Sequence, residues 1–328
     1  MQKDEFECVY VETLRSPTIS VDMKEQGLQI VRCPHLPQLK FAEGLTVTIK
    51  LKEKVILVLS QARYPKNFAW RMLVYKAVVE LDSMILFIKG LNLRRGRISD
   101  TDNLVCVFGS NLDTDLLNAR DFKKLDTMDL GSKVFKTKVL MAAQEVIRCE
   151  KPNGLEIQEI QGMKASVWRS RSGLLPSVAR LELKSMKSSK PVKMFRPLHQ
   201  VCACIMLWNQ APFLREWIMY HGYLGVQRWF LYDNNNDENI EEVIESLGSF
   251  NVSRHMWPWI KTQEAGFSHY ALRARQECEW VTFMDVDEFL NPIKYIQNET
   301  MPTDYTQTGA TVMERLINGL LQIEIWMA

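Results

Sequence analysis

Three acidic side chains stand together near the end of the sequence, directly after an apolar run. Residues 281–284 read VTFM, and Asp285, Asp287 and Glu288 follow within four positions. Because carboxylates at this spacing repel one another, the cluster favours a site that holds a cation. Carboxylate oxygens are the ligands that Mg²⁺ and Mn²⁺ prefer. The alternative interpretation is a solvated loop that follows a strand.

Asp285 and Asp287 have the spacing that a metal site of this kind needs. They lie two residues apart at the end of an extended segment, so both side chains can point the same way. The sequence therefore predicts that Asp285 and Asp287 bind Mn²⁺ or Mg²⁺. Such a metal would neutralise a diphosphate and stabilise it as a leaving group.

The elements that must position these carboxylates alternate between strands and helices. The predicted strands are 201–207, 228–232, 252–257 and 280–284, and the predicted helices are 211–224, 238–247 and 267–278. This order is typical of a doubly wound α/β fold with a parallel sheet. Ligands bind at the carboxyl ends of the strands in such sheets. The polar residues expected at that edge include Asn209, Asp233, Asn234, Asp285 and Asp287.

Helical spacing also predicts which faces of two helices are buried. The predicted buried residues are Phe213, Trp217, Tyr220 and Leu224 in the first helix and Phe267, Ala271, Ala274 and Cys278 in the third. The opposite face of the third helix presents His269, Arg273 and Gln276, with Arg275 and Lys261 nearby in sequence. We expect cations at these positions to reach phosphates. A solvated helix face is the alternative.

The first half of the chain is β-rich. Residues 45–52 read LTVTIKLK, and this alternation predicts a half-buried strand. Further short strands are expected at 84–88, 104–108, 134–141 and 178–183. Short strands with turn signals between them favour a sandwich-like domain over residues 1–185. Residues 186–199 are rich in lysine, serine and proline, which predicts a solvated linker rather than a nucleic-acid patch. Residues 200–328 then form the α/β part.

Composition and short motifs limit which binding partners and which cellular compartment we expect. The 328 residues carry a formal net charge of only +2, which gives no electrostatic case for nucleic acid or an anionic membrane. No apolar stretch approaches the roughly 20 residues that span a bilayer, and no signal peptide opens the sequence, so we expect a soluble chain. Two sequons, at Asn251 and Asn298, suit a secretory lumen.

The seven cysteines show no C-x-x-C pair, which argues against a zinc site. The odd number leaves at least one thiol free. Cys202 and Cys204 lie two apart in an apolar run, so both would point to one face of a strand. We expect both to be buried, inert thiols.

Long segments of this sequence resemble glycosyltransferase family 92. The matching segments are CACIMLWNQAPFLREWIMYHGYLGVQRWFLYDNNNDENIEEVI and WPWIKTQEAGFSHYALRARQECEWVTFMDVDEF. The upstream pieces FIKGLNLRRGRISD and AAQEVIRCE resemble the N-terminal region of plant members. The resemblance covers roughly residues 65–290.

The resemblance implies a GT-A fold, which is Rossmann-like and here incomplete, and an inverting, metal-dependent transfer of a hexose to a glycan. In plant members the donor is UDP-galactose and the acceptor a β-1,4-galactan, and the proteins are anchored in the Golgi membrane with the enzyme in the lumen. The family's DxD motif falls on Asp285 and Asp287, and the strand-end Asp233 matches the position that meets the nucleoside. Gln263, Arg273 and Arg275 lie in the stretch facing the donor.

Two differences between this sequence and the family pattern affect the activity that we expect. The family's membrane anchor has no counterpart here, and only 41 residues follow Asp287, where the acceptor half of a GT-A enzyme normally lies. We therefore expect a truncated chain that binds UDP and metal but transfers sugar weakly or not at all. A non-catalytic UDP- or glycan-binding fragment is the alternative function. A phosphatase of the haloacid dehalogenase type also carries DxD after a strand, but Phe289 and the three preceding strands disagree with it.

Overall fold

The computed structural model describes residues 6–11, 14–23, 29–34, 48–51, 72–91, 101–109, 112, 134–170, 172–183, 197–236 and 238–290. The chain forms two compact units. One comprises residues 66–193, and the other comprises residues 1–65 with 194–328. This division differs from the predicted one, which joins the first 65 residues to the following β-rich stretch. Alternation along a strand reveals its own two faces but not which distant strands it joins.

The unit of residues 66–193 is built on an eight-stranded sheet. Its elements are β6 (Leu73–Val79), β7 (Ser83–Lys89), β8 (Leu104–Gly109), β9 (Val134–Ala143), β10 (Val146–Glu150), the short helix α2 (Ile157–Ile160), β11 (Lys164–Arg169), β12 (Gly173–Leu174) and β13 (Leu181–Leu183). Their order is β12-β11-β8-β9-β10-β7-β6-β13, and all neighbours are antiparallel except β13 and β6. The strands predicted at 84–88, 104–108 and 134–141 are confirmed, whereas the last predicted strand is shorter. A sandwich stays a prediction.

The amino-terminal residues add two small sheets to the other unit. Strands β1 (Phe6–Val11), β2 (Leu14–Pro17) and β5 (Thr48–Leu51) form a sheet in the order β2-β1-β5, and β3 (Ser20–Met23) pairs with β4 (Gln29–Arg32). Half of the strand predicted at 45–52 is therefore seen as β5. The predicted linker lies outside the described residues up to residue 196, and so do residues 291–328.

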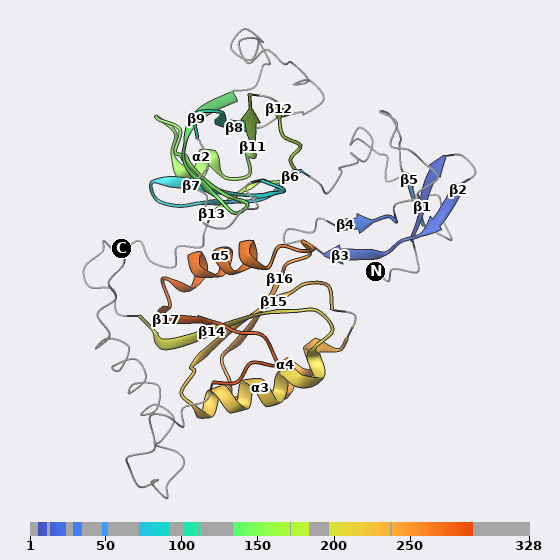
Figure 1. Cartoon of the computed structure of the whole chain (residues 1–328), viewed down its shortest axis with the longest axis vertical. Helices are drawn as coiled ribbons and strands as arrows, with labels where there is room; N and C mark the ends of the chain where they lie inside the picture. The colour runs from blue at the N-terminus through green and yellow to red at the C-terminus, as the bar shows by residue number, and fades with distance from the viewer. Residues whose placement is uncertain are drawn as a thin grey trace, which may run out of the picture. The chain divides into compact units, whose positions relative to one another are not determined.

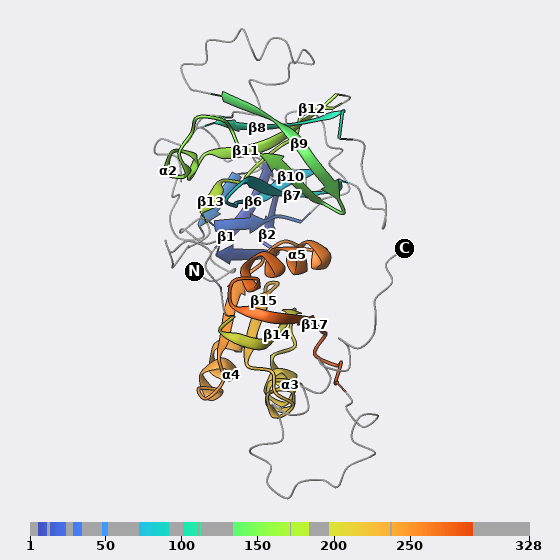
Figure 2. The same cartoon turned by 90° about the vertical axis from the view of Figure 1, so that its left-hand side faces the viewer.

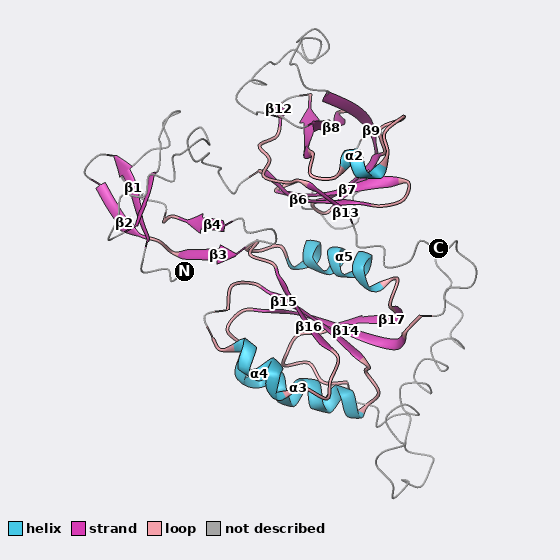
Figure 3. Cartoon of the chain, turned by 180° about the vertical axis from the view of Figure 1, so that it is seen from behind, coloured by secondary structure: helices cyan, strands magenta, loops and turns pink. Residues whose placement is uncertain are grey.

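A four-stranded sheet carries the predicted α/β order. Its elements are β14 (His199–Leu207), α3 (Ala211–Tyr223), β15 (Arg228–Asp233), α4 (Ile240–Ser246), β16 (Val252–Met256), α5 (Gln263–Ala274) and β17 (Cys278–Phe283). The four strands are parallel in the order β16-β15-β14-β17. Helix α5 covers one face, and helices α3 and α4 cover the other (Figures 1 and 2). The same three layers are seen from behind in Figure 3.

Both faces of the two central strands, β14 and β15, are mostly buried, as expected for parallel strands between helices. In β14 the side chains of Val201, Ala203, Ile205 and Leu207 belong to one apolar cluster with α3 residues such as Trp217. On the other face, Phe230 of β15 contacts the ring of Tyr270 in α5, with ring centroids 4.9 Å apart.

The predicted helix faces are partly wrong. In α3 the buried residues are Ala211, Leu214, Trp217, Ile218 and His221, while the predicted core residue Phe213 is 60% exposed. Helix α5 begins one turn earlier than predicted, at Gln263, and Cys278 starts β17 instead of ending the helix. Its buried residues include His269, which was assigned to the exposed face. This histidine is buried because its Nδ1 bonds to the Tyr232 hydroxyl at 2.7 Å.

Six of the seven cysteines form disulfides, so the prediction of a buried thiol at Cys202 is wrong. The pairs are Cys8–Cys33, Cys106–Cys149 and Cys202–Cys278. Cys202 and Cys278 are far apart in sequence but lie on the neighbouring strands β14 and β17. Cys204 is the buried free thiol, as predicted, and burial raises its pKa.

Candidate functional site

The acidic cluster forms a tight turn at the carboxyl edge of the parallel sheet. Asp285–Glu288, called the acidic turn below, comes after β17 and Met284. The backbone N–H of Asp285 donates to Oε2 of Glu288 at 2.9 Å, and the backbone N–H of Glu288 donates to the Asp285 carbonyl at 3.0 Å. Asp287 and Glu288 are exposed, while Asp285 is half-buried. The turn therefore holds its three carboxylates within a few residues at the edge where ligands bind.

Asp285 is the carboxylate whose environment is most perturbed. Burial raises its pKa, the neighbouring charges of Glu288 and Asp287 raise it further, and a hydrogen bond from Gln263 lowers it. That bond joins Nε2 of Gln263 to Oδ1 of Asp285 at 3.1 Å. Gln263 is the first residue of α5, so the positive end of this helix lies beside the acidic turn. A bound cation would offset the repulsion from Glu288 and Asp287 that adds to the effect of burial on the pKa of Asp285.

The carboxylates of the acidic turn fit a cation that is also coordinated by a bound ligand. Within the part of the chain that the structure describes, no three His, Cys, Asp or Glu side chains converge on one point. Mg²⁺ is commonly held by one or two carboxylates, with substrate phosphates and water completing the shell. Asp285 and Asp287 match that pattern, whereas an all-protein cage would need more ligands.

Asp233 stands at the carboxyl end of β15, as predicted, but its carboxylate is turned inward. The side chain is fully buried, and both of its oxygens accept hydrogen bonds from the protein. Oδ2 accepts from Nε of Arg254 at 2.6 Å, and Oδ1 accepts from the backbone and the side chain of Asn236 at 2.9 and 2.8 Å. Asp233 thus anchors the loop that follows β15. Sequence inspection did not find Arg254, because its partner lies 21 residues away.

The asparagines after β15 connect the ends of neighbouring strands. Nδ2 of Asn234 donates to the carbonyls of Trp257 and Trp259, at 2.7 and 2.9 Å, in the loop after β16. Asn236 accepts a hydrogen bond from the backbone N–H of Asn209, after β14. Asn209 has φ of 52°, a left-handed conformation that asparagine tolerates. The predicted residues Asn209 and Asn234 therefore lie at one edge, where they shape the loops.

Two arginines that were predicted to bind the sugar donor lie away from the acidic turn. Arg273 and Arg275 stand at the far end of α5 from Gln263. Ten residues separate Gln263 from Arg273, which is about 15 Å along a helix. The guanidinium of Arg273 lies over the rings of Phe230 and Tyr232, 5.6 and 6.0 Å from their centroids. The structure thus brings Gln263 to Asp285 but does not bring Arg273 and Arg275 there.

Helix α3 fastens the segment that follows the acidic turn. Nε1 of Trp217 donates to the carbonyl of Glu288 at 3.0 Å, and the Tyr220 hydroxyl donates to the carbonyl of Leu290 at 2.6 Å. Nε2 of His221 accepts from the backbone N–H of Leu290 at 3.3 Å, while its Nδ1 donates to the Trp217 carbonyl. We call Trp217, Tyr220 and His221 the α3 clamp. The sequence pattern had marked two of these residues only as core.

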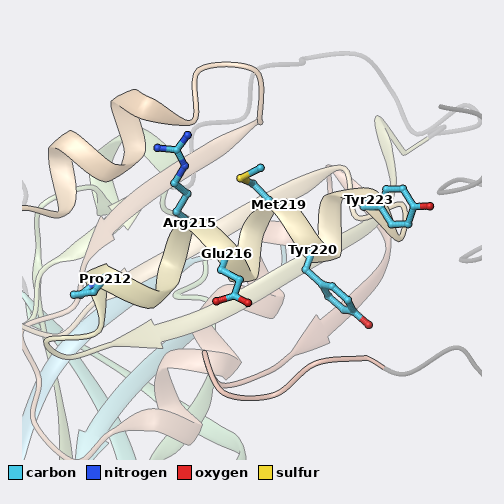
Figure 4. Close-up of a pocket in the computed structure, with 6 residues that line it drawn as sticks. All are labelled: Pro212, Arg215, Glu216, Met219, Tyr220 and Tyr223. Carbon is cyan, nitrogen blue, oxygen red and sulfur yellow. The ribbon is translucent and has the colours of Figure 1, made fainter. Parts of the chain in front are cut away.

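The outer side of α3 carries a hollow of about 580 Å³. Its lining residues, drawn in Figure 4, are Pro212, Arg215, Glu216, Met219, Tyr220 and Tyr223. Neither Asp285 nor Gln263 lines this hollow, so it is distinct from the carboxyl edge. At that edge, the aromatic surface comes instead from Trp208, which follows β14 directly and is 68% exposed.

A parallel sheet with helices on both faces and an acidic turn at its carboxyl edge places the unit in the class of α/β proteins, which generally bind ligands at that edge. Comparison with known families identifies the unit. Residues 199–310 match the family model of glycosyltransferase family 92, and the chain belongs to this family. The match extends past residue 290, so the family resemblance reaches further than the sequence inspection predicted.

Curated relatives agree with the family match. The chain is 43% identical to a glycosyltransferase family 92 protein of Arabidopsis thaliana over 86% of this chain and 47% of the relative. It is 38% identical to one from Ricinus communis over 95% of this chain and 55% of the relative. It is 39% identical to one from Oryza sativa subsp. japonica over 88% and 48%, respectively. The chain thus spans about half the length of the curated relatives it matches.

Proposed function

We propose that the carboxyl edge of the parallel sheet binds a UDP-sugar and that the protein takes part in transferring the sugar to a glycan. Family membership supports a glycosyltransferase. The observation that carries the proposal is the acidic turn, which sits beside the first residue of α5 at the carboxyl edge. UDP-galactose is the proposed donor and a β-1,4-galactan the proposed acceptor.

Asp285 and Asp287 would hold Mn²⁺ or Mg²⁺ there. The bound metal would neutralise the diphosphate and make it a better leaving group. The chain's own residues have separate tasks. Gln263 orients the carboxylate of Asp285, and the positive end of α5 favours a negatively charged ligand. The exposed ring of Trp208 offers a surface on which a base or a sugar can stack.

The proposed transfer proceeds with inversion in one displacement. The oxygen of an acceptor hydroxyl forms a bond to the anomeric carbon, the bond from that carbon to the diphosphate breaks, and UDP leaves with the electron pair. The hydroxyl proton passes to a base, which must lie within about 2.6–3.2 Å of the acceptor oxygen. The acceptor must also be held in line with the anomeric carbon.

The proposed place of action is the lumen of the secretory pathway, in the Golgi. Three disulfides support an oxidising compartment, since such bonds are rare in a reducing cytosol. Among the helices that the structure describes, none is long and apolar enough to cross a membrane.

A transferase assay tests the proposal. The purified chain is incubated with Mn²⁺, β-1,4-galactan oligomers and one of several UDP-hexoses, and UDP release and product mass are followed. The expected result is UDP binding that depends on Mn²⁺ and is lost in Asp287→Asn, with galactose added to the oligomer only slowly. UDP binding with no detectable transfer to any oligomer would instead favour a non-catalytic binding unit. A chain that shows neither UDP binding nor sugar transfer would contradict the proposal.

A further inference from the structure

A sequon lies on the surface of the parallel-sheet unit. Residues 251–253 read Asn-Val-Ser, at the point where the loop after α4 enters β16. The side chain of Asn251 is exposed, while its backbone carbonyl is fixed by the N–H of Trp229 at 2.9 Å and by Arg228 at 3.2 Å. A modification on this side chain would therefore project from a rigid base into solvent.

Asn251 lies at the opposite edge of the sheet from the acidic turn. The four strands are parallel, and Asn251 precedes β16, whereas Asp285 follows β17. The five residues of β16 span about 17 Å at roughly 3.3 Å per residue. A bulky group on Asn251 thus leaves the carboxyl edge open.

The position next to β16 gives such a group a physical task. Strand β16 stands at one end of the sheet order, and among the described strands only β15 pairs with it. An edge strand presents backbone groups that can pair with another chain, and proteins block such edges with charge, bulges or bulk. A large hydrophilic group at the start of β16 hinders that pairing.

We propose that Asn251 carries an N-linked glycan, an inference that rests on the lumenal location in the proposed function. The nitrogen of the Asn251 amide forms a bond to the anomeric carbon of a lipid-linked oligosaccharide diphosphate. The bond from that carbon to the diphosphate breaks, the lipid diphosphate leaves, and one amide proton passes to a base of the modifying enzyme. The remaining N–H can still donate to Nε2 of His199, which lies 3.3 Å from Nδ2.

The test uses the full chain, produced in insect cells behind a cleavable signal sequence so that it enters the lumen. Digestion with peptide N-glycosidase in H₂¹⁸O converts a glycosylated asparagine into labelled aspartate, which mass spectrometry assigns to a position. We expect label at Asn251 and one step in gel mobility that is absent from Asn251→Gln and Ser253→Ala. Ser253→Thr keeps the sequon and should keep the glycan. Asn298→Gln separates this site from the second sequon, which lies outside the described residues.

The outcomes are distinct from those of the proposed function. If the chain is secreted with its disulfides formed and the Asn251 peptide carries no label, the inference is wrong, whatever the variants show. Asn251→Gln should retain the UDP affinity of the unmodified chain, because the glycan lies at the far edge. A chain that binds UDP but lacks the glycan contradicts this inference alone. A glycosylated chain that binds no UDP contradicts the proposed function alone.

Discussion

The α3 clamp predicts that a residue remote from the ligand controls the acidic turn. Tyr220→Phe removes one hydroxyl and nothing else. That hydroxyl donates to the carbonyl of Leu290 at 2.6 Å, two residues after the turn ends. The ring remains, and its contact with Phe289, 5.1 Å between ring centroids, is retained. Only the polar half of this attachment is lost.

The structure sets the size of the effect. A hydrogen bond between neutral groups contributes about 0.5–1.5 kcal/mol to stability. Tyr220 is half-buried, so water can replace the lost donor and the lower part of that range applies best. If the bond serves mainly to hold the acidic turn, its loss should weaken Mn²⁺-dependent UDP binding by about two- to fivefold, since 1.4 kcal/mol is tenfold. Isothermal titration of UDP in the presence of Mn²⁺ measures this loss.

Ser246→Ala is the matched control. The Ser246 hydroxyl donates to the carbonyl of Val243 at 2.7 Å, at the end of α4, so this variant loses the same kind of bond away from the turn. We expect Ser246→Ala to keep the UDP affinity of the parent chain, while Tyr220→Phe lowers it. Equal UDP affinity in both variants, with comparable losses of stability, would refute the role of the clamp.

Two further predictions concern stability. Burial lowers the pKa of His221, against a smaller opposite effect of its bond to Trp217, so the unfolded chain binds a proton more readily than the folded one. The free energy of unfolding should therefore fall as the pH drops below about 6.5. His221→Gln should flatten this pH dependence in urea titrations. An unchanged pH dependence in that variant would contradict the prediction. The Cys202–Cys278 disulfide closes a separation of 76 residues, and replacing both cysteines by alanine should cost about 4 kcal/mol in the same assay. A cost near zero would show that the bond does not form.

The order of elements in the parallel sheet could be predicted from the sequence because each strand is a short, continuous apolar run. All four predicted strands overlap observed ones, and the residues that follow them do meet at one edge. The pairing of Gln263 with Asp285 follows from the same topology, since the start of a crossover helix and the end of the next strand lie at the same edge.

Side-chain direction could not be predicted in the same way. Apolar residues occupy more than one side of α3, so spacing alone chose Phe213, which is exposed. His269 was treated as polar, yet a hydrogen bond to Tyr232 makes its burial possible. The partner of Asp233 is an arginine on the next strand, and only the register of β15 and β16 places Arg254 there.

The two arginines that the family resemblance assigned to the donor lie at the end of α5 away from Gln263. Arg273 and Arg275 are close to Asp285 along the chain, but α5 and β17 run in opposite directions. The end of α5 therefore lies at the amino edge of the sheet, where the neighbouring residue Glu277 pairs with Arg228. A helix of 12 residues is long enough to separate its two ends by the depth of the sheet.

The affinity for UDP with and without Mn²⁺, measured in the parent chain and in Asp287→Asn, tests whether the acidic turn binds a metal together with the donor. Asparagine keeps the shape of the side chain and removes its charge. We expect Mn²⁺ to strengthen UDP binding in the parent chain and Asp287→Asn to lose about tenfold or more of that gain. Equal UDP affinity with and without Mn²⁺ in the parent chain would contradict it and would leave the acidic turn as a solvated loop.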